Sequence, residues 1–74
     1  MKCTIKLCWD EEAKIWYSQA DDTLRLVLEA SSFDALVERI RLAAPEMLEL
    51  NYGYKGPIEL VFEAERIEHL DMVS

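Results

Sequence analysis

The sequence has few of the residues from which catalytic and ligand-binding sites are usually built. Its 74 residues include one histidine, two cysteines and two glycines. Two glycines are too few for a phosphate-binding loop, and a nucleophile would have only the near-terminal His69 as a histidine base. Cys3 and Cys8 with one distant histidine do not match a zinc pattern. We therefore expect no enzymatic activity, no cofactor and no metal.

Long apolar runs are also missing. No segment approaches the roughly 20 apolar residues that span a bilayer, and the N-terminus lacks the layout of a signal peptide. A cytoplasmic location without a membrane partner is therefore expected. Cys3 and Cys8 differ in parity along an expected strand, so they should lie on opposite faces of it and stay free thiols, as in a reducing compartment.

Basic residues are scarce beside acidic ones. Eight basic and fifteen acidic residues give a net charge of −7. This charge opposes the phosphate backbone, so we expect no direct nucleic-acid partner, whereas it would speed the encounter with a basic protein. Solubility alone accounts for the acidity equally well. The 51% hydrophobic content is enough for one globular domain over residues 1–74, although such a short chain buries only about 60% of its unfolded surface.

The segment Glu29–Asn51 carries the one strong helical period, and Ser32 is its expected N-cap. Pro45 interrupts it, and an interior proline costs a helix about 3 kcal/mol. We therefore predict one helix over Phe33–Ala44 and a further turn or two that restart at Pro45. Leu42 should be exposed. The apolar face consists of Phe33, Leu36, Val37, Ile40, Ala43, Ala44, Met47 and Leu48.

Period-two alternation and turn residues predict strands over Lys2–Trp9, Lys14–Gln19, Arg25–Ala30 and Ile58–Leu70, with a turn at Asp21–Thr23. In the first strand, Cys3, Ile5, Leu7 and Trp9 share a face. In the second, Ile15 and Tyr17 oppose Trp16, and we favour Ile15 and Tyr17 inward. In the third, Leu26 and Leu28 point inward and Val27 outward. In the last, Ile58, Leu60, Phe62 and Ala64 alternate with Glu59, Val61, Glu63 and Glu65.

The resulting order is β-β-β-α-β, an α+β fold. Two hairpins give a three-stranded antiparallel meander, and the helix returns the chain so that the last strand lies parallel to the first. The helix covers one face of the sheet. The opposite face is left open to water or to a partner.

The open face should carry a partner-binding patch of Trp16, Val27 and Val61, with aromatic and apolar anchors. The acidic run Glu59, Glu63, Glu65 and Glu68 is a solvated face first and an acidic docking edge second, with Glu59, Glu63 and Glu65 as its partner-binding residues. Two exposed sheet edges predict a homodimer. Two further groups of carboxylates, Asp10–Glu12 and Asp21–Asp22, lie at opposite ends of one short strand and about 20 Å apart, so they cannot share a metal.

Three segments carry a family resemblance: IKLCWDEEAKIWYSQADD, LVLEASSFDALVERIRLAAPEMLELN and IELVFEA. They resemble a bacterial family of small HicB-like proteins, known mainly as a domain of unknown function. The Trp9-Asp10 and Glu29-Ala30 pairs are the more specific parts of the match. In that family Pro-Gly often stands before the third strand, where this sequence has Leu24-Arg25.

The resemblance implies a partial ribonuclease-H-like fold without ribonuclease activity. HicB antitoxins bind and block a small toxin that cleaves messenger RNA, and they typically add a C-terminal DNA-binding domain, which we do not expect here. The first hypothesis is therefore a non-catalytic binding module, an antitoxin that occludes a small basic ribonuclease. The alternative is a self-associating domain with a role unrelated to toxins.

Overall fold

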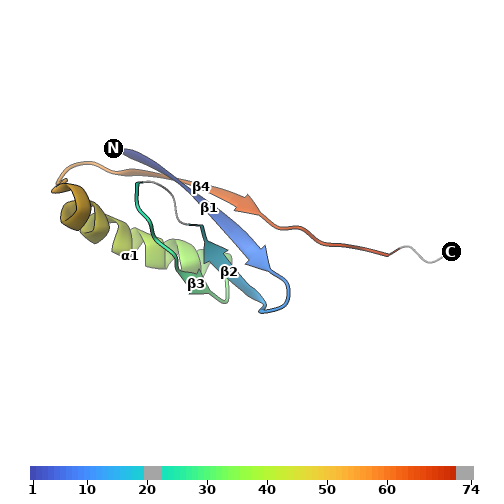
Figure 1. The fold of residues 1–74 in the computed structure, drawn as a ribbon. Helices are drawn as coiled ribbons and strands as arrows, with labels where there is room; N and C mark the ends of the chain where they lie inside the picture. The colour runs from blue at the N-terminus through green and yellow to red at the C-terminus, as the bar shows by residue number, and fades with distance from the viewer. Residues whose placement is uncertain (20–22, 72–74) are drawn as a thin grey trace.

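The computed structural model describes residues 1–19 and 23–71. It contains strands β1 (Lys2–Asp10), β2 (Ile15–Ser18), β3 (Glu29–Ala30) and β4 (Glu59–Glu65), with helix α1 (Phe33–Tyr52) between β3 and β4. The sheet order is β3-β2-β1-β4, with β1 antiparallel to β2 and parallel to β4. The helix covers one face (Figure 1). This is the predicted α+β fold.

The core lies between α1 and the sheet. From β1, the side chains of Cys3, Ile5 and Leu7 are buried against the helix, as the alternation predicted. Leu24 and Leu26, from the segment before β3, close the same core. The alternation predicted for β4 is seen as well, because Leu60 and Phe62 pack against this core. Ala64 lies on the same face but is exposed.

Helix α1 has a cap at each end. The Ser32 hydroxyl accepts a hydrogen bond from the Ala35 N–H at 3.1 Å, as an N-cap residue does. At the other end Gly53 adopts a left-handed conformation with φ of 63°, and its N–H donates to the Glu49 carbonyl oxygen at 2.8 Å. The buried stripe of the helix consists of Leu36, Ile40, Ala44 and Leu48.

The predicted break at Pro45 is wrong, because α1 is one continuous helix that contains this proline. The buried stripe continues on both sides of it, through Ala44 and Leu48. Burial of a Leu side chain contributes about 1.5–3 kcal/mol, comparable to the cost of an interior proline. Packing on the sheet therefore offsets that cost. Leu42 is exposed, as predicted, with 69% of its surface accessible.

The predicted inward face of β2 is also wrong. The antiparallel register pairs Trp9 with Trp16 and Leu7 with Ser18, so Trp16 shares the helix face with Leu7. The Trp16 ring lies edge-on to Phe33, the first residue of α1, with centroids 5.3 Å apart. Tyr17 pairs with Cys8 on the open face instead.

The predicted third strand, Arg25–Ala30, is shortened to β3. The buried hydroxyl of Ser18 replaces backbone hydrogen bonds that a longer third strand would make with β2. It donates to the Leu26 carbonyl oxygen and accepts from the Leu28 N–H, each at 2.9 Å. Leu26 is buried, Leu28 packs against the core and Val27 is exposed, as predicted. Of the turn predicted at Asp21–Thr23, Asp21 and Asp22 lie outside the described residues.

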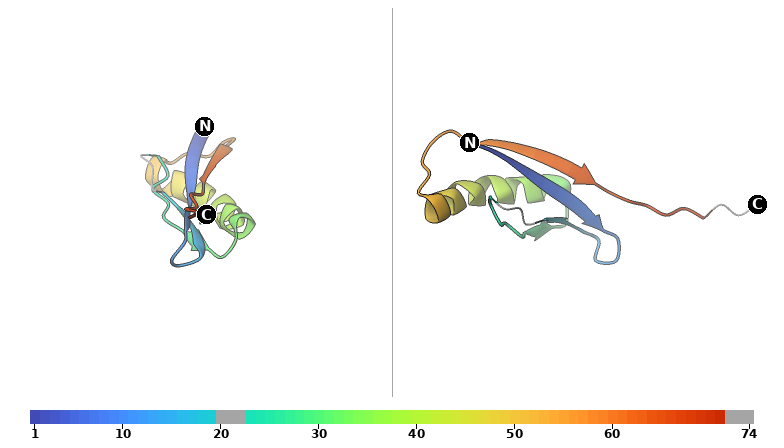
Figure 2. Two further views of the ribbon diagram at one scale, coloured as in Figure 1. Left: turned by 90° about the vertical axis from the view of Figure 1, so that its right-hand side faces the viewer. Right: turned by 45° about the horizontal axis from the view of Figure 1, so that its top comes forward.

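The predicted last strand, Ile58–Leu70, ends early at Glu65. The chain from Arg66 to Asp71 then leaves the body of the fold as an extended segment (Figures 1 and 2). This segment accounts for the elongated shape, with principal extents of 58 × 18 × 17 Å.

Candidate protein-binding site

Strand β4 forms one edge of the sheet, with β1 as its neighbour. The Glu59 N–H donates to the Met1 carbonyl oxygen at 2.8 Å, so the backbone groups of Glu59 point toward β1. Backbone directions alternate along a strand, so the N–H and C=O groups of the intervening residues point outward. We call the outward backbone groups of Leu60, Phe62 and Ala64 the β4 edge.

The open face beside the β4 edge is acidic. The side chains of Glu59, Val61, Glu63 and Glu65 lie on this face, as the alternation predicted, opposite Lys2, Thr4, Lys6 and Cys8 of β1. The Lys6 Nζ atom lies 2.8 Å from a carboxylate oxygen of Glu65. The hydrogen bond to Glu65, followed by the charge of that carboxylate, raises the pKa of Lys6 above its usual 10.5.

Glu59 and Glu63 differ from Glu65 in their partners. Both are exposed, and within residues 1–19 and 23–71 neither lies within 4.0 Å of a basic nitrogen. Their negative charges therefore stay available beside the β4 edge. Val61 lies between them in the sequence and is half-buried.

On the helix side, a shallow apolar groove runs between α1 and the start of β4. Its volume is about 170 Å³, and it is lined by Arg41, Ala44, Pro45, Ile58 and Leu60. The right-hand view of Figure 2 shows how the chain joins the C-terminal end of α1 to β4 across this side of the fold. The β4 edge is thus flanked by carboxylates on one face and by an apolar groove on the other.

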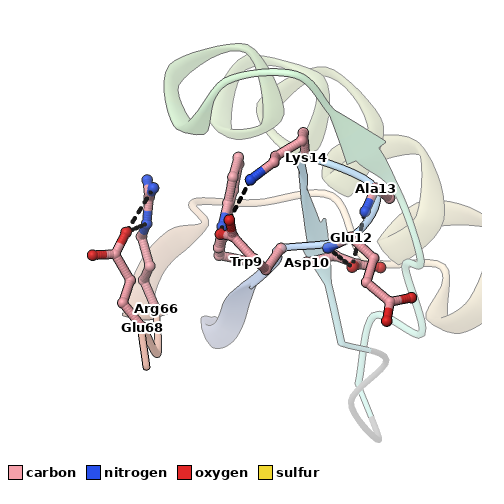
Figure 3. Close-up of polar contacts among 8 residues, drawn as sticks. Trp9, Asp10, Glu12, Ala13, Lys14, Arg66 and Glu68 are labelled. Carbon is pink, nitrogen blue, oxygen red and sulfur yellow. Dashed lines mark hydrogen bonds and ion pairs between the residues drawn. The ribbon is translucent and has the colours of Figure 1, made fainter. Parts of the chain in front are cut away.

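The far end of β1 carries a second polar cluster (Figure 3). The Trp9 indole N–H donates to a Glu11 carboxylate oxygen at 2.6 Å, and the Glu11 carboxylate also accepts from Lys14. The Lys14 and Trp9 hydrogen bonds, in that order, lower the pKa of Glu11 below its usual 4.5. Arg66 lies over the Trp9 ring, with its Cζ atom 4.3 Å from the centroid. This contact joins the first residue after β4 to the end of β1.

The predicted patch of Trp16, Val27 and Val61 is not a single surface. Trp16 lies on the helix face, where it packs against the core. Val27 is 68% exposed but belongs to the segment before β3, while Val61 is on β4, and these two strands form opposite edges of the sheet. The acidic residues Glu59, Glu63 and Glu65 are brought together on one face. Sequence reasoning missed the groove, because it depends on how α1 lies against β4.

The remaining chemical candidates stay apart. Cys3 and Cys8 are buried free cysteines on opposite faces of β1, as predicted. His69 is exposed on the segment after β4. Across residues 1–19 and 23–71, His, Cys, Asp and Glu side chains form no cluster of three that could hold a metal ion. In the same part of the chain, no helix has the length and apolar character to cross a membrane.

These features define a small α+β domain in which β4 is an edge strand with acidic side chains on its open face. The chain belongs to the family described as a domain of unknown function, DUF1902, whose model matches residues 2–74. It is similar to the crystal structure of a hypothetical protein from the extremely thermophilic bacterium Thermus thermophilus, with 31% identity and a TM-score of 0.77. That match covers 95% of this chain and 100% of the other. The comparison with curated proteins gave no match.

Proposed function

We propose that this protein is a non-catalytic protein-binding module and that the β4 edge is its binding surface. The observation that carries the proposal is the row of outward backbone groups at Leu60, Phe62 and Ala64, at the outer side of the sheet. Strand edges of this kind are templates for pairing with another chain. The neighbouring Glu59 and Glu63 would favour a basic partner over an acidic one.

The finer form of the proposal is an antitoxin. The resemblance of the Trp9-Asp10 and Glu29-Ala30 regions to HicB-like proteins supports a small basic ribonuclease as the partner, held in a complex that occludes its active site. The net charge of −7 would speed such an encounter at low salt, and apolar contacts would then hold the complex.

The second candidate is self-association. One observation favours it: Ile67 and Leu70, on the segment after β4, are 60% and 85% exposed. Exposed apolar residues on an extended segment are suited to contact with another chain. A second copy of the protein could bury them.

Affinity capture from the native host tests the binding function. Three forms of the full chain would be compared: the unmodified protein, Ala64→Pro and Ala64→Thr. Because the Ala64 N–H points away from β1, proline there removes an outward donor and keeps the β1–β4 hydrogen bonds, whereas threonine retains the donor. A protein captured by the first and third forms but lost with Ala64→Pro supports the proposal. Equal capture by all three contradicts the role of the β4 edge.

Co-expression tests the antitoxin form separately. A small basic ribonuclease encoded beside this gene should stop arresting growth when this protein is abundant and folded. Arrest that persists under those conditions rejects the antitoxin role and leaves the binding function to the capture experiment.

A further inference from the structure

We propose that the partner adds an extended basic segment to the β4 edge as a fifth strand of the sheet; this inference rests on the proposed binding function. The outward N–H and C=O groups of Leu60, Phe62 and Ala64 supply the hydrogen bonds. From Arg66 to Asp71, the described part of the chain after β4 continues away from the sheet and does not fold back over this strand (Figures 1 and 2). An extended segment therefore has access to the whole strand.

The side chains around the edge set the chemistry of the added strand. Side chains of adjacent strands lie next to each other on the same face, with Cβ atoms about 4.5–5.5 Å apart. Residues of the partner beside Glu59 and Glu63 would therefore be Lys or Arg. A basic residue is less needed beside Glu65, because Lys6 already forms an ion pair of 2.8 Å with it.

The opposite face of the added strand meets apolar surface. Residues there lie beside Leu60 and Phe62 and next to the groove that includes Ala44, Pro45 and Ile58. A groove of about 170 Å³ accommodates side chains of the size of Val or Ile. The preferred sequence thus alternates basic and aliphatic residues.

A second copy of β4 fits this edge poorly. A two-fold axis through Val61 would place Glu59 opposite Glu63, and an axis through Phe62 would place Glu59 opposite Glu65. An axis at Glu63 would place that residue opposite its own copy, and one at Ala64 would oppose Glu63 and Glu65. Like charges directly opposite each other destabilise a strand pair. The acidic row therefore selects a basic strand over a copy of this chain.

Synthetic peptides test the inference with the full-length protein. The probe alternates lysine with valine or threonine over the length of β4. One control is methylated on the backbone amide nitrogens that point to either edge of the extended peptide. The methyl groups prevent strand pairing, and the charge of the peptide is kept. A second control replaces lysine by glutamate. Backbone amide shifts measured by NMR report where each peptide binds, and a titration gives its Kd.

We expect the basic peptide to shift the amides of Leu60, Phe62 and Ala64, and both controls to bind at least tenfold more weakly. Glu63→Gln should weaken binding of the basic peptide by about two- to fivefold, the effect of losing one cross-strand ion pair. Glu46→Gln, the same charge change on an exposed site of α1, should leave the Kd unchanged. Ala64→Pro should abolish the shifts, and Ala64→Thr should retain them.

Two outcomes overturn the inference. Equal affinity for the basic peptide and its methylated control would show general charge attraction in place of strand addition. The second outcome is a basic peptide that does not shift the β4 amide resonances, although the protein captures a partner from its host. That result would reject strand addition at β4 and would not contradict the binding function. Failure of the binding function itself has a different signature, which is that no host protein is captured by any of the three forms.

Discussion

Lys6 and Glu65 form an ion pair of 2.8 Å across the parallel β1–β4 ladder, on the face of the sheet that α1 does not cover. Lys6 lies opposite Glu63 in the register, yet its ammonium group bonds diagonally to Glu65. Of the three β4 glutamates on this face, Glu65 is therefore neutralised by the ion pair, whereas the other two keep their charge. The charged pair, Glu59 and Glu63, is the part of the row that a partner would meet.

The ion pair predicts a perturbed lysine titration. Because the pKa of Lys6 is raised in the folded protein, its contribution to stability is complete below pH 10.5 and is lost as the pH rises through the higher, folded value. Glu65→Gln removes the main cause and should return the pKa of Lys6 toward 10.5. NMR titration of the Lys6 side chain measures this. Glu63→Gln is the matched control and should change the pKa less, since Glu63 is its weakest contributor.

The hairpin cluster predicts an acidic transition at Trp9. The pKa of Glu11 is lowered by hydrogen bonds from Lys14 and from the Trp9 indole, so the stability it contributes is present above pH 4.5 and is lost as the pH falls through the lower, folded value. The indole N–H resonance of Trp9 should shift with a midpoint below 4.5. Lys14→Met should move the midpoint upward, whereas Lys55→Met, elsewhere in the fold, should not. A midpoint at 4.5 in the unmodified protein would contradict the geometry.

Ser18 predicts the largest loss of stability from a single polar atom. Its side chain is 1% exposed and serves both the Leu26 carbonyl oxygen and the Leu28 N–H. Ser18→Ala leaves both backbone groups without this partner, and an unsatisfied buried group costs about 1–3 kcal/mol. Urea unfolding should show a loss in this range. Ser31→Ala, at an exposed site, should change the free energy of unfolding by less than about 0.5 kcal/mol.

The fold could be predicted from the sequence where the period was clear. Alternation in β1 and β4 placed Ile5, Leu7 and Phe62 on the helix face, and the helical period with Ser32 located α1. The same alternation put the β4 glutamates on the open face. The strand order made β4 an edge, so much of the candidate site was accessible to sequence reasoning.

The misassigned parts depend on contacts between distant residues. Ile15, Trp16 and Tyr17 are successive apolar residues without alternation, so the register of the hairpin and the contact of Trp16 with Phe33 decide the face. The shortening of β3 depends on the hydroxyl of Ser18. The hydrogen bond between Glu59 and Met1 determines which backbone groups of β4 face outward. No local sequence pattern predicts this bond.

Pro45 offers a route to a more stable protein. Alanine at this position restores the backbone donor within α1 and removes the clash with the preceding turn, a difference of about 3 kcal/mol in a helix interior. Loss of the rigidity that proline gives the unfolded chain offsets about 0.4–1 kcal/mol. Pro45→Ala should therefore raise the free energy of unfolding by about 2 kcal/mol. Glu46→Ala, at the next exposed position, should have an effect below about 1 kcal/mol, and a loss of stability in Pro45→Ala would show that the proline ring packs favourably in the groove.

Self-association gives the last prediction, because the charge row of β4 determines its salt dependence. Pairing of two copies through this strand sets glutamates opposite one another. Salt weakens the repulsion between such exposed charges, since the Debye length falls to about 10 Å at 0.1 M ionic strength. A dimer formed through β4 should therefore be weak at low salt and strengthen as salt is added. Binding of the basic peptide should show the opposite trend.

Light scattering at high protein concentration measures the dimer. Glu63→Gln should promote it at low salt, whereas Ala64→Pro should suppress it at every salt concentration. A monomer mass in both low and high salt would reject the homodimer. A dimer that salt leaves unchanged would have to form through another surface, with the exposed Ile67 and Leu70 as the first candidates. The sign of the salt dependence thus separates pairing through the acidic strand from apolar contact through the segment that follows it.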